Sequence, residues 1–330
     1  ALPPAVLKVT SIKRLFLESN DLAELPHQLP SLTSLTELWL GYNSIRDLSL
    51  DAGSCCGLTA LTVLDLSSNR LKALPEDLAL LTSLRSLSLD NNQLKALPCM
   101  QDWTSLLRLS ASNNELNCLP ATFSSLVSLQ TMVVNNNLID VLPANLSRLT
   151  SLRSFDISYN CLRHLGLPDN GLHQLSSLTS LEAKMNEIAE LSVPGLAGTC
   201  MFEGLEVLNL KGNKLLSLPQ EVLHLHRLKE LDLSYNLIYD HQGLVSFIRS
   251  QVEMHMERRS LTDLPALVLK SRELRHLFLS HNLLLKLPET MTSLTSLQTL
   301  HVDNNRLILL ERWISELQSL TDVNLSVNNL

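Results

Sequence analysis

Histidine is the side chain of this sequence whose type and spacing most invite a metal-binding hypothesis, because ten histidines are present. His224 and His226 are two residues apart, and His255 and His301 hold equivalent places in a repeated pattern. Residues two apart do not share a helical face, and strands two apart in a sheet are separated by about 9.5 Å. A metal needs closely converging ligands. We therefore expect no metal and no cofactor, and we interpret these histidines as solvated groups that make binding sensitive to pH.

Paired carboxylates are a second chemical possibility. Asp156 and Glu182 fall on strands predicted to be neighbours and could form a hydrolase dyad. An open sheet, however, offers no pocket that excludes water, and the sequence has no phosphate loop, nucleophile elbow or zinc knuckle. We expect no catalysis in this segment. Whether the full-length protein is an enzyme stays open.

The overall composition narrows the class further. The chain has 26 Lys and Arg against 33 Asp and Glu, which disfavours a nucleic-acid partner. No apolar run approaches the roughly 18 residues of a membrane span. The six cysteines lack framework spacing, which favours reduced thiols and a cytoplasmic location.

A leucine repeat positions all of these side chains. Leucine fills 82 of 330 positions. Leucine-like residues occupy the first, fourth and sixth positions of each unit and Asn the ninth, as in Leu84-x-x-Leu87-x-Leu89-x-x-Asn92, which Leu97-Pro98 follows. The ninth-position Asn recurs at 20, 43, 69, 92, 114, 137, 160, 186, 213, 236, 282, 305 and 328.

One interval in this series, from Asn236 to Asn282, is twice the usual length. It contains a degenerate unit with Gln251, Met254, Met256 and Arg259 at the first, fourth, sixth and ninth positions, so fourteen units are predicted. Because Arg only donates hydrogen bonds, it cannot replace Asn. The unit is either simply degenerate or a flexible joint.

Elementary geometry predicts the fold of one unit. The Leu-x-Leu alternation makes a short strand, and successive strands stack into a parallel sheet. A buried Asn must satisfy its donors and acceptor, so we expect a stack of Asn side chains bonded to adjacent backbone turns. The Leu-Pro step ends the strand path, because proline fixes φ and lacks a donor.

These residues resemble the leucine-rich repeat family along the whole chain. The intervening pattern, such as Leu74-Pro75-Glu76-Asp77-Leu78, is similar to the 23-residue intracellular class, which includes Ras-pathway and cell-polarity scaffolds. The resemblance implies an α/β leucine-rich-repeat solenoid: a curved right-handed horseshoe with a parallel concave sheet. We expect one domain over residues 1–330, cut within a repeat at both ends, because polar caps are absent at Leu2-Pro3 and at Leu330.

Three units carry insertions, at residues 51–56, 167–171 and 193–198. Each is either a contact loop or a tolerated surface insertion, since loops accept added length at low cost.

The third, fifth and seventh positions of each unit project from the sheet, and we call this surface the concave face. Twelve of its side chains are acidic and four (Arg14, Arg108, Lys184 and Lys211) are basic, so the concave face carries a net charge of −8. The net charge of the whole chain is −7, so the rest of the chain carries +1. A surface of one sign attracts and orients a complementary partner. We therefore expect a protein partner with a basic patch; the alternative is that the charge keeps an exposed sheet soluble.

Aromatic side chains are the expected anchors on this face. Phe16 and Trp39 hold the fifth position in the first two units, with Tyr42 beside them. His255, Phe278 and His301 hold it in three consecutive later units, and Tyr159 and Tyr235 precede the ladder Asn. The predicted partner-binding set combines these aromatic residues with acidic ones: Phe16, Trp39, Tyr42, Asp65, Asp90, Asp156, Tyr159, Glu182, Asp232, Tyr235, His255, Phe278 and His301.

The sequence thus predicts a protein-binding scaffold of unknown oligomeric state. Two alternatives stay open: the recognition arm of a larger signalling enzyme, such as a kinase, phosphatase, cyclase or GTPase-linked polypeptide, and a structural component of a cytoskeletal or ciliary assembly.

Overall fold

The computed structural model describes most of the chain. The described residues are 3, 5–26, 28–48, 57–165, 170–191, 202, 204–216, 225, 227–237, 253–258, 261–264, 268–270 and 273–330. The insertions at 51–56 and 193–198, most of that at 167–171, and Gln251 and Arg259 lie outside them. The chain forms two compact units: a first unit of residues 1–162 and 169–177, and a second unit of residues 163–168 and 178–330.

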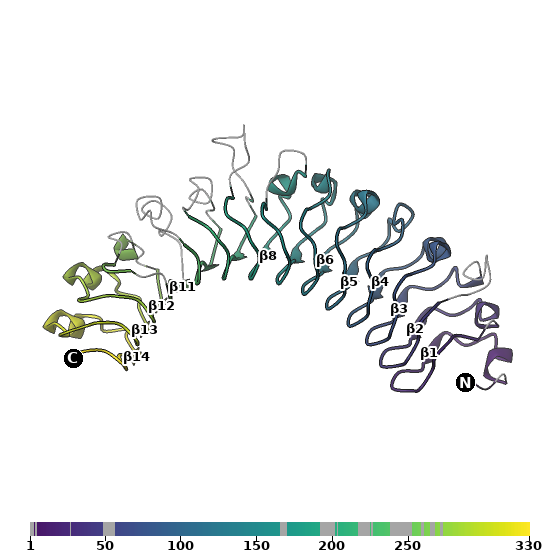
Figure 1. The fold of residues 1–330 in the computed structure, drawn as a ribbon, viewed down its shortest axis with the longest axis horizontal. Helices are drawn as coiled ribbons and strands as arrows, with labels where there is room; N and C mark the ends of the chain where they lie inside the picture. Colours follow the sequence, from purple (N-terminus) through teal and green to yellow (C-terminus); the bar gives the residue numbers. More distant parts are fainter. Residues whose placement is uncertain are drawn as a thin grey trace. The chain divides into compact units, whose positions relative to one another are not determined.

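The first unit is built on a ladder of three-residue parallel strands, each paired with the strand of the next repeat (Figure 1). Equivalent repeat positions face one another, as in Leu15 with Leu38 and Leu38 with Leu64. The strands are β1 Arg14–Phe16, β2 Glu37–Trp39, β3 Val63–Asp65, β4 Ser86–Ser88, β5 Arg108–Ser110, β6 Thr131–Val133 and β7 Ser154–Asp156.

The second unit repeats this arrangement. Met254 pairs with Leu231 on one side and Leu277 on the other, which confirms that the long interval after Asn236 holds an additional repeat. The strands are β8 Ser180–Glu182, β9 Val207–Asn209, β10 Glu230–Asp232, β11 Glu253–His255, β12 His276–Phe278, β13 Thr299–His301 and β14 Asp322–Asn324.

The Asn ladder is present as predicted. Asn114 is buried, and its Oδ1 accepts the Leu94 N–H at 3.0 Å. Its Nδ2 donates to Leu89 O, Ala111 O and Ser112 O at 3.0, 3.1 and 3.1 Å. One amide thereby joins the backbone turns of adjacent repeats, and the same pattern recurs at Asn43, Asn69, Asn92, Asn137, Asn160, Asn213, Asn236, Asn282 and Asn305.

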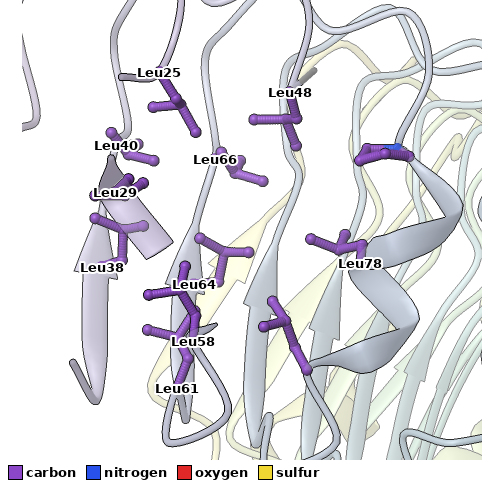
Figure 2. Close-up of a pocket in the computed structure, with 12 residues that line it drawn as sticks. Leu25, Leu29, Leu38, Leu40, Leu48, Leu58, Leu61, Leu64, Leu66 and Leu78 are labelled. Atoms are coloured by element: carbon purple, nitrogen blue, oxygen red, sulfur yellow. The ribbon is translucent and has the colours of Figure 1, made fainter. Parts of the chain in front are cut away.

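The leucines of the repeat fill the core behind the sheet. The side chain at the fourth position is buried in each described strand from β1 to β13. In the first unit, the leucines around Leu40, Leu64 and Leu66 point toward one another and leave a gap of about 20 Å³ (Figure 2). Its walls are leucines and Pro75, so it offers no polar partner to a water molecule.

The connections that return to the next strand contain short 3₁₀ helices. Pro75, Pro120 and Pro288 immediately precede three of them in extended conformation, so the Leu-Pro step marks the start of the returning segment as expected. The described 3₁₀ helices are η1 Val6–Lys8, η2 Leu29–Ser31, η4 Glu76–Leu80, η5 Ala121–Ser125, η6 Leu146–Arg148, η7 Leu172–Gln174, η11 Val268–Lys270, η12 Glu289–Ser293 and η13 Arg312–Glu316.

Strands, buried Asn side chains and returning 3₁₀ segments recur at the predicted positions, so the predicted solenoid class is confirmed. Alternation along each strand then fixes which side chains the concave face displays.

Candidate functional site

The acidic charge of the concave face is unequal between the two compact units. In the first unit this face carries five acidic and two basic side chains, and in the second it carries seven acidic and two basic. The acidic residues of the second unit are Glu182, Glu230, Asp232, Glu253, Glu257, Asp303 and Asp322.

The first unit presents the aromatic pair that the sequence predicted at its N-terminal end. The rings of Phe16 and Trp39 stack with centroids 6.1 Å apart and an angle of 18° between their planes. Phe16 is 58% exposed and Tyr42 is 67% exposed, whereas Trp39 is half-buried and donates its Nε1–H to Glu37 Oε2 at 3.3 Å. An open apolar surface therefore lies beside a carboxylate.

Several predicted site carboxylates also have a structural role that sequence reasoning missed. Asp65, Asp156 and Asp232 at the fifth position each accept the backbone N–H of the serine two residues later, at 2.8, 2.9 and 2.9 Å. Such local bonds hold the chain where it leaves the strand. The Asp-x-Ser spacing was the available signal.

Asp90, at the seventh position, is held from the next repeat instead. It accepts the Ser110 hydroxyl at 2.7 Å and the Ser112 backbone N–H at 2.6 Å. This carboxylate therefore links β4 to β5 and displays its charge in a fixed place.

A hollow of about 130 Å³ opens on the concave face of the second unit. Four carboxylates from three strands line it: Glu182 from β8, Glu230 and Asp232 from β10, and Glu253 from β11. Asn209 and His255 complete its polar wall, and Val207, Leu208 and Leu231 also line it. The repeat brings these residues together, because positions 3 and 5 of adjacent strands lie side by side in register.

His255 forms one wall of the hollow and is held between two carboxylates of its own strand segment. Its Nε2 lies 3.0 Å from Glu253 Oε1, and its Nδ1 lies 3.2 Å from Glu257 Oε1. Burial opposes protonation of the ring, but the hydrogen bond and charge of Glu257, together with Asp232 and Glu253, outweigh it and raise the pKa of His255 above 6.5.

The same bond acts on Glu257. Burial opposes its ionisation, but hydrogen bonds from His255 and from Ser234 Oγ, the latter at 2.6 Å, outweigh burial and lower the pKa of Glu257 below 4.5.

The predicted run of rings at the fifth position forms a continuous stack. His255 lies flat on Phe278, with centroids 4.4 Å apart and 8° between the planes, and Phe278 meets the edge of His301 at 5.1 Å. His301 Nε2 lies 3.1 Å from Asp322 Oδ2. We call His255, Phe278 and His301 the ring stack; aromatic geometry of this kind adds to area burial.

The predicted tyrosines lie at the edge of the concave face in an unusual backbone conformation. Tyr42, Tyr159 and Tyr235 have φ of 56°, 54° and 60°, which is the left-handed region. Tyr159 is 48% exposed and Tyr235 44% exposed, and the Tyr235 ring has Lys211 Nζ at 5.3 Å and the Arg258 guanidinium at 5.1 Å. The eighth position has positive φ in all fourteen repeats, with Gly212 the glycine among them.

Other chemistry is sparse in the described part of the chain. No group of three or more His, Cys, Asp or Glu side chains there is arranged to hold a metal ion. Cys99, Cys118 and Cys161 are free thiols. Among the described residues, no helix combines the length and apolar character needed to span a bilayer.

Similarity to known proteins agrees with this architecture. A family model described as leucine rich repeat matches residues 48–94. A solved leucine-rich-repeat protein of Leptospira interrogans is 29% identical, with a TM-score of 0.88 over 98% of this chain and 81% of that one. The repeat geometry and these matches together define the class: the chain is a leucine-rich-repeat protein.

Two further proteins match this chain. Toll-like receptor 10 of Bos taurus is 31% identical over 117 residues, which are 32% of this chain and 14% of the receptor's length. TLR13, solved in a complex with ssRNA13, is 26% identical with a TM-score of 0.77, covering 98% of this chain and 52% of TLR13. The leucine-rich-repeat fold is typically a protein-interaction module and is generally non-catalytic.

Proposed function

We propose that this chain is a non-catalytic protein-binding module whose concave face binds a partner with a basic patch. The observation that carries the proposal is the hollow of the second unit, where Glu182, Glu230, Asp232 and Glu253 converge. Within the described residues, no Lys or Arg side chain forms an ion pair with Glu230, Asp232 or Glu253. Their field is therefore directed toward an incoming cation.

Aromatic side chains supply anchors beside this charge. Phe16, Trp39 and Tyr42 in the first unit, and the ring stack with Tyr235 in the second, present flat rings next to carboxylates. Large rings contribute contact area at low entropic cost, and desolvated anchors of this kind dominate binding energy. Asp65, Asp90, Asp156 and Tyr159 complete the proposed surface.

A polyanionic ligand fits this face poorly. TLR13 has been solved with ssRNA13, but nucleic-acid affinity depends on neutralising phosphates with Lys and Arg. The concave face of the second unit instead carries seven acidic side chains against two basic ones. We propose a protein ligand and a cytoplasmic location, the latter because free thiols such as Cys99 and Cys118 persist in reducing compartments.

Charge reversal at the hollow tests the proposal. The probe is a fluorescent twelve-residue peptide of alternating Lys and Ser, compared with its Glu-Ser counterpart and with single-stranded RNA, measured by anisotropy. Each exposed ion pair contributes about 0.2–1 kcal/mol, and reversal adds repulsion. Glu230→Lys/Asp232→Lys/Glu253→Lys should therefore weaken binding of the lysine peptide by about tenfold or more.

The matched control changes charge equally away from the concave face. Glu289, Glu311 and Glu316 are exposed and lie within or next to the 3₁₀ helices η12 and η13. Reversing these three to Lys should change the affinity less than about threefold. Equal losses in both triple variants, or tighter binding of RNA than of the lysine peptide, would contradict the proposal.

A further inference from the structure

The ring stack and the hollow share one residue, His255. One side of its ring lies parallel to Phe278 at 4.4 Å, and the same side chain lines the hollow with Asp232 and Glu253. A flat ring surface and several carboxylates therefore meet within one small region that spans β10, β11 and β12.

The chemistry of this region is specific to planar cations. A guanidinium is planar, donates five N–H bonds in a fixed fork that matches carboxylates, and stacks on rings. A lysine ammonium is a compact, strongly hydrated point charge that makes no such stack. The ion pair alone would serve both cations, whereas the rings distinguish between them.

Carboxylates of the adjacent strands β10 and β11 line the opening. Asp232 uses Oδ1 to accept the Ser234 N–H, and Glu253 uses Oε1 toward His255. Glu230 is exposed at the third position of β10, next to Glu253 on β11. Oxygens of two strands thus face the same space, as a forked donor requires.

We propose that the hollow and the ring stack bind an arginine side chain of the partner, and that this site discriminates arginine from lysine. This inference rests on the proposed function, because it assumes that a basic segment lies on the concave face. The guanidinium donates to Asp232 and to Glu230 or Glu253, and its plane lies against the half-buried rings of the ring stack. Arginine is thereby the preferred residue of the bound segment.

Two peptides with equal charge separate the inference from the proposed function. Both have nine residues and three cations spaced by Gly and Ser, with Arg in one and Lys in the other. Binding is measured by fluorescence anisotropy with the full chain at pH 8. The wild-type chain should bind the arginine peptide about tenfold more tightly than the lysine peptide, since cation–π contacts and bidentate bonds add to charge.

Substitutions in the ring stack locate the preference. Phe278→Leu should reduce the arginine preference to less than about threefold, because it should weaken binding of the arginine peptide more than binding of the lysine peptide. His255→Gln, which keeps a polar side chain at the wall, should reduce it in the same way and serves as a second variant if Phe278→Leu disturbs folding in circular dichroism. Leu285→Ala, at an exposed site in the same repeat as Phe278, is the control that should preserve it.

The outcomes are distinct. Equal binding of both peptides by the wild-type chain would overturn the arginine site and leave the proposed function intact. A preference that persists in both ring variants would also overturn it. If neither peptide binds, the proposed function fails and the arginine site fails with it.

Discussion

Removal of one ladder amide should destabilise the fold by a definite amount, and Asn114 is a well-enclosed example. In Asn114→Ala, Leu94 N–H loses its acceptor in a buried place. The three carbonyls that lose the Asn114 donor each keep another: Leu89 O keeps Asn92 Nδ2, Ala111 O keeps Asn137 Nδ2, and Ser112 O keeps the Asn91 N–H. The main penalty is therefore a single orphaned donor.

The magnitude follows from this count. A buried donor without a partner costs about 1–3 kcal/mol, and weakened bonding at three carbonyls adds about 1 kcal/mol. We expect Asn114→Ala to lower the free energy of unfolding by about 2–4 kcal/mol. Asn114→Asp keeps the acceptor but places a carboxylate against three carbonyl oxygens, so its loss at neutral pH should be at least as large.

Urea unfolding, followed by circular dichroism and by tryptophan fluorescence, to which the buried Trp103 contributes, measures this loss. Asn20→Ala is the matched control, because Asn20 is exposed and, within the described residues, its side chain donates only to Leu17 O and Glu18 O of its own repeat. The control should lose less than about 1 kcal/mol. A loss below about 0.5 kcal/mol for Asn114→Ala, or one equal to the control, would refute the reasoning.

Three further outcomes are expected. Tyr42→Asn should raise the free energy of unfolding by about 0.5–1 kcal/mol, because Asn tolerates positive φ better than Tyr. The same substitution should weaken peptide binding. A loss of stability in urea unfolding would contradict this prediction. Because the pKa of His255 is raised on folding, its stabilising pair with Glu257 is fully present below about pH 6.5 and is lost as pH rises through the folded-state pKa. His255→Gln should abolish that part of the pH dependence of unfolding, and NMR titration of the ring should show a midpoint above 6.5. Gly212→Ala should cost about 1–2 kcal/mol, since its Cβ would lie 2.3 Å from Met185 Sδ at a φ of +68°, and Met185→Ala should relieve part of this loss in thermal unfolding.

Repetition explains how much of the fold the sequence predicts. One register, set by positions such as Leu87, Leu89 and Asn92, recurs along the chain, so each copy supports the others. The degenerate copy with Met254 and Met256 still pairs in register and buries both side chains. Its first and ninth positions, Gln251 and Arg259, lie outside the described residues. Both interpretations of this unit, a simply degenerate repeat and a flexible joint, therefore stay predictions.

Local backbone chemistry was less visible in the sequence. The left-handed conformation at the eighth position arises because the chain turns just before the ladder Asn. The signal in the sequence is that Asn91, Asn113 and Gly212, whose residue types favour positive φ, occupy this position. The Asp-x-Ser bonds at Asp156 and Asp232 are a similar case, because a side chain that faces a partner can also hold the backbone.

The candidate site could be predicted as a face but not as a cavity. Alternation places Asp232, His255 and Phe278 on one surface from sequence alone. Whether His255 stacks on Phe278 and also bridges two glutamates depends on side-chain rotamers, which no repeat pattern specifies.

The position of a bound basic segment is the most direct test of the account. Carbodiimide labelling of carboxylates, quantified by mass spectrometry with and without the arginine peptide, reports which acidic side chains become covered. The account predicts that Glu230, Asp232 and Glu253 are protected from labelling while Glu289, Glu311 and Glu316 remain reactive. Protection of the second group without the first would contradict binding on the concave face.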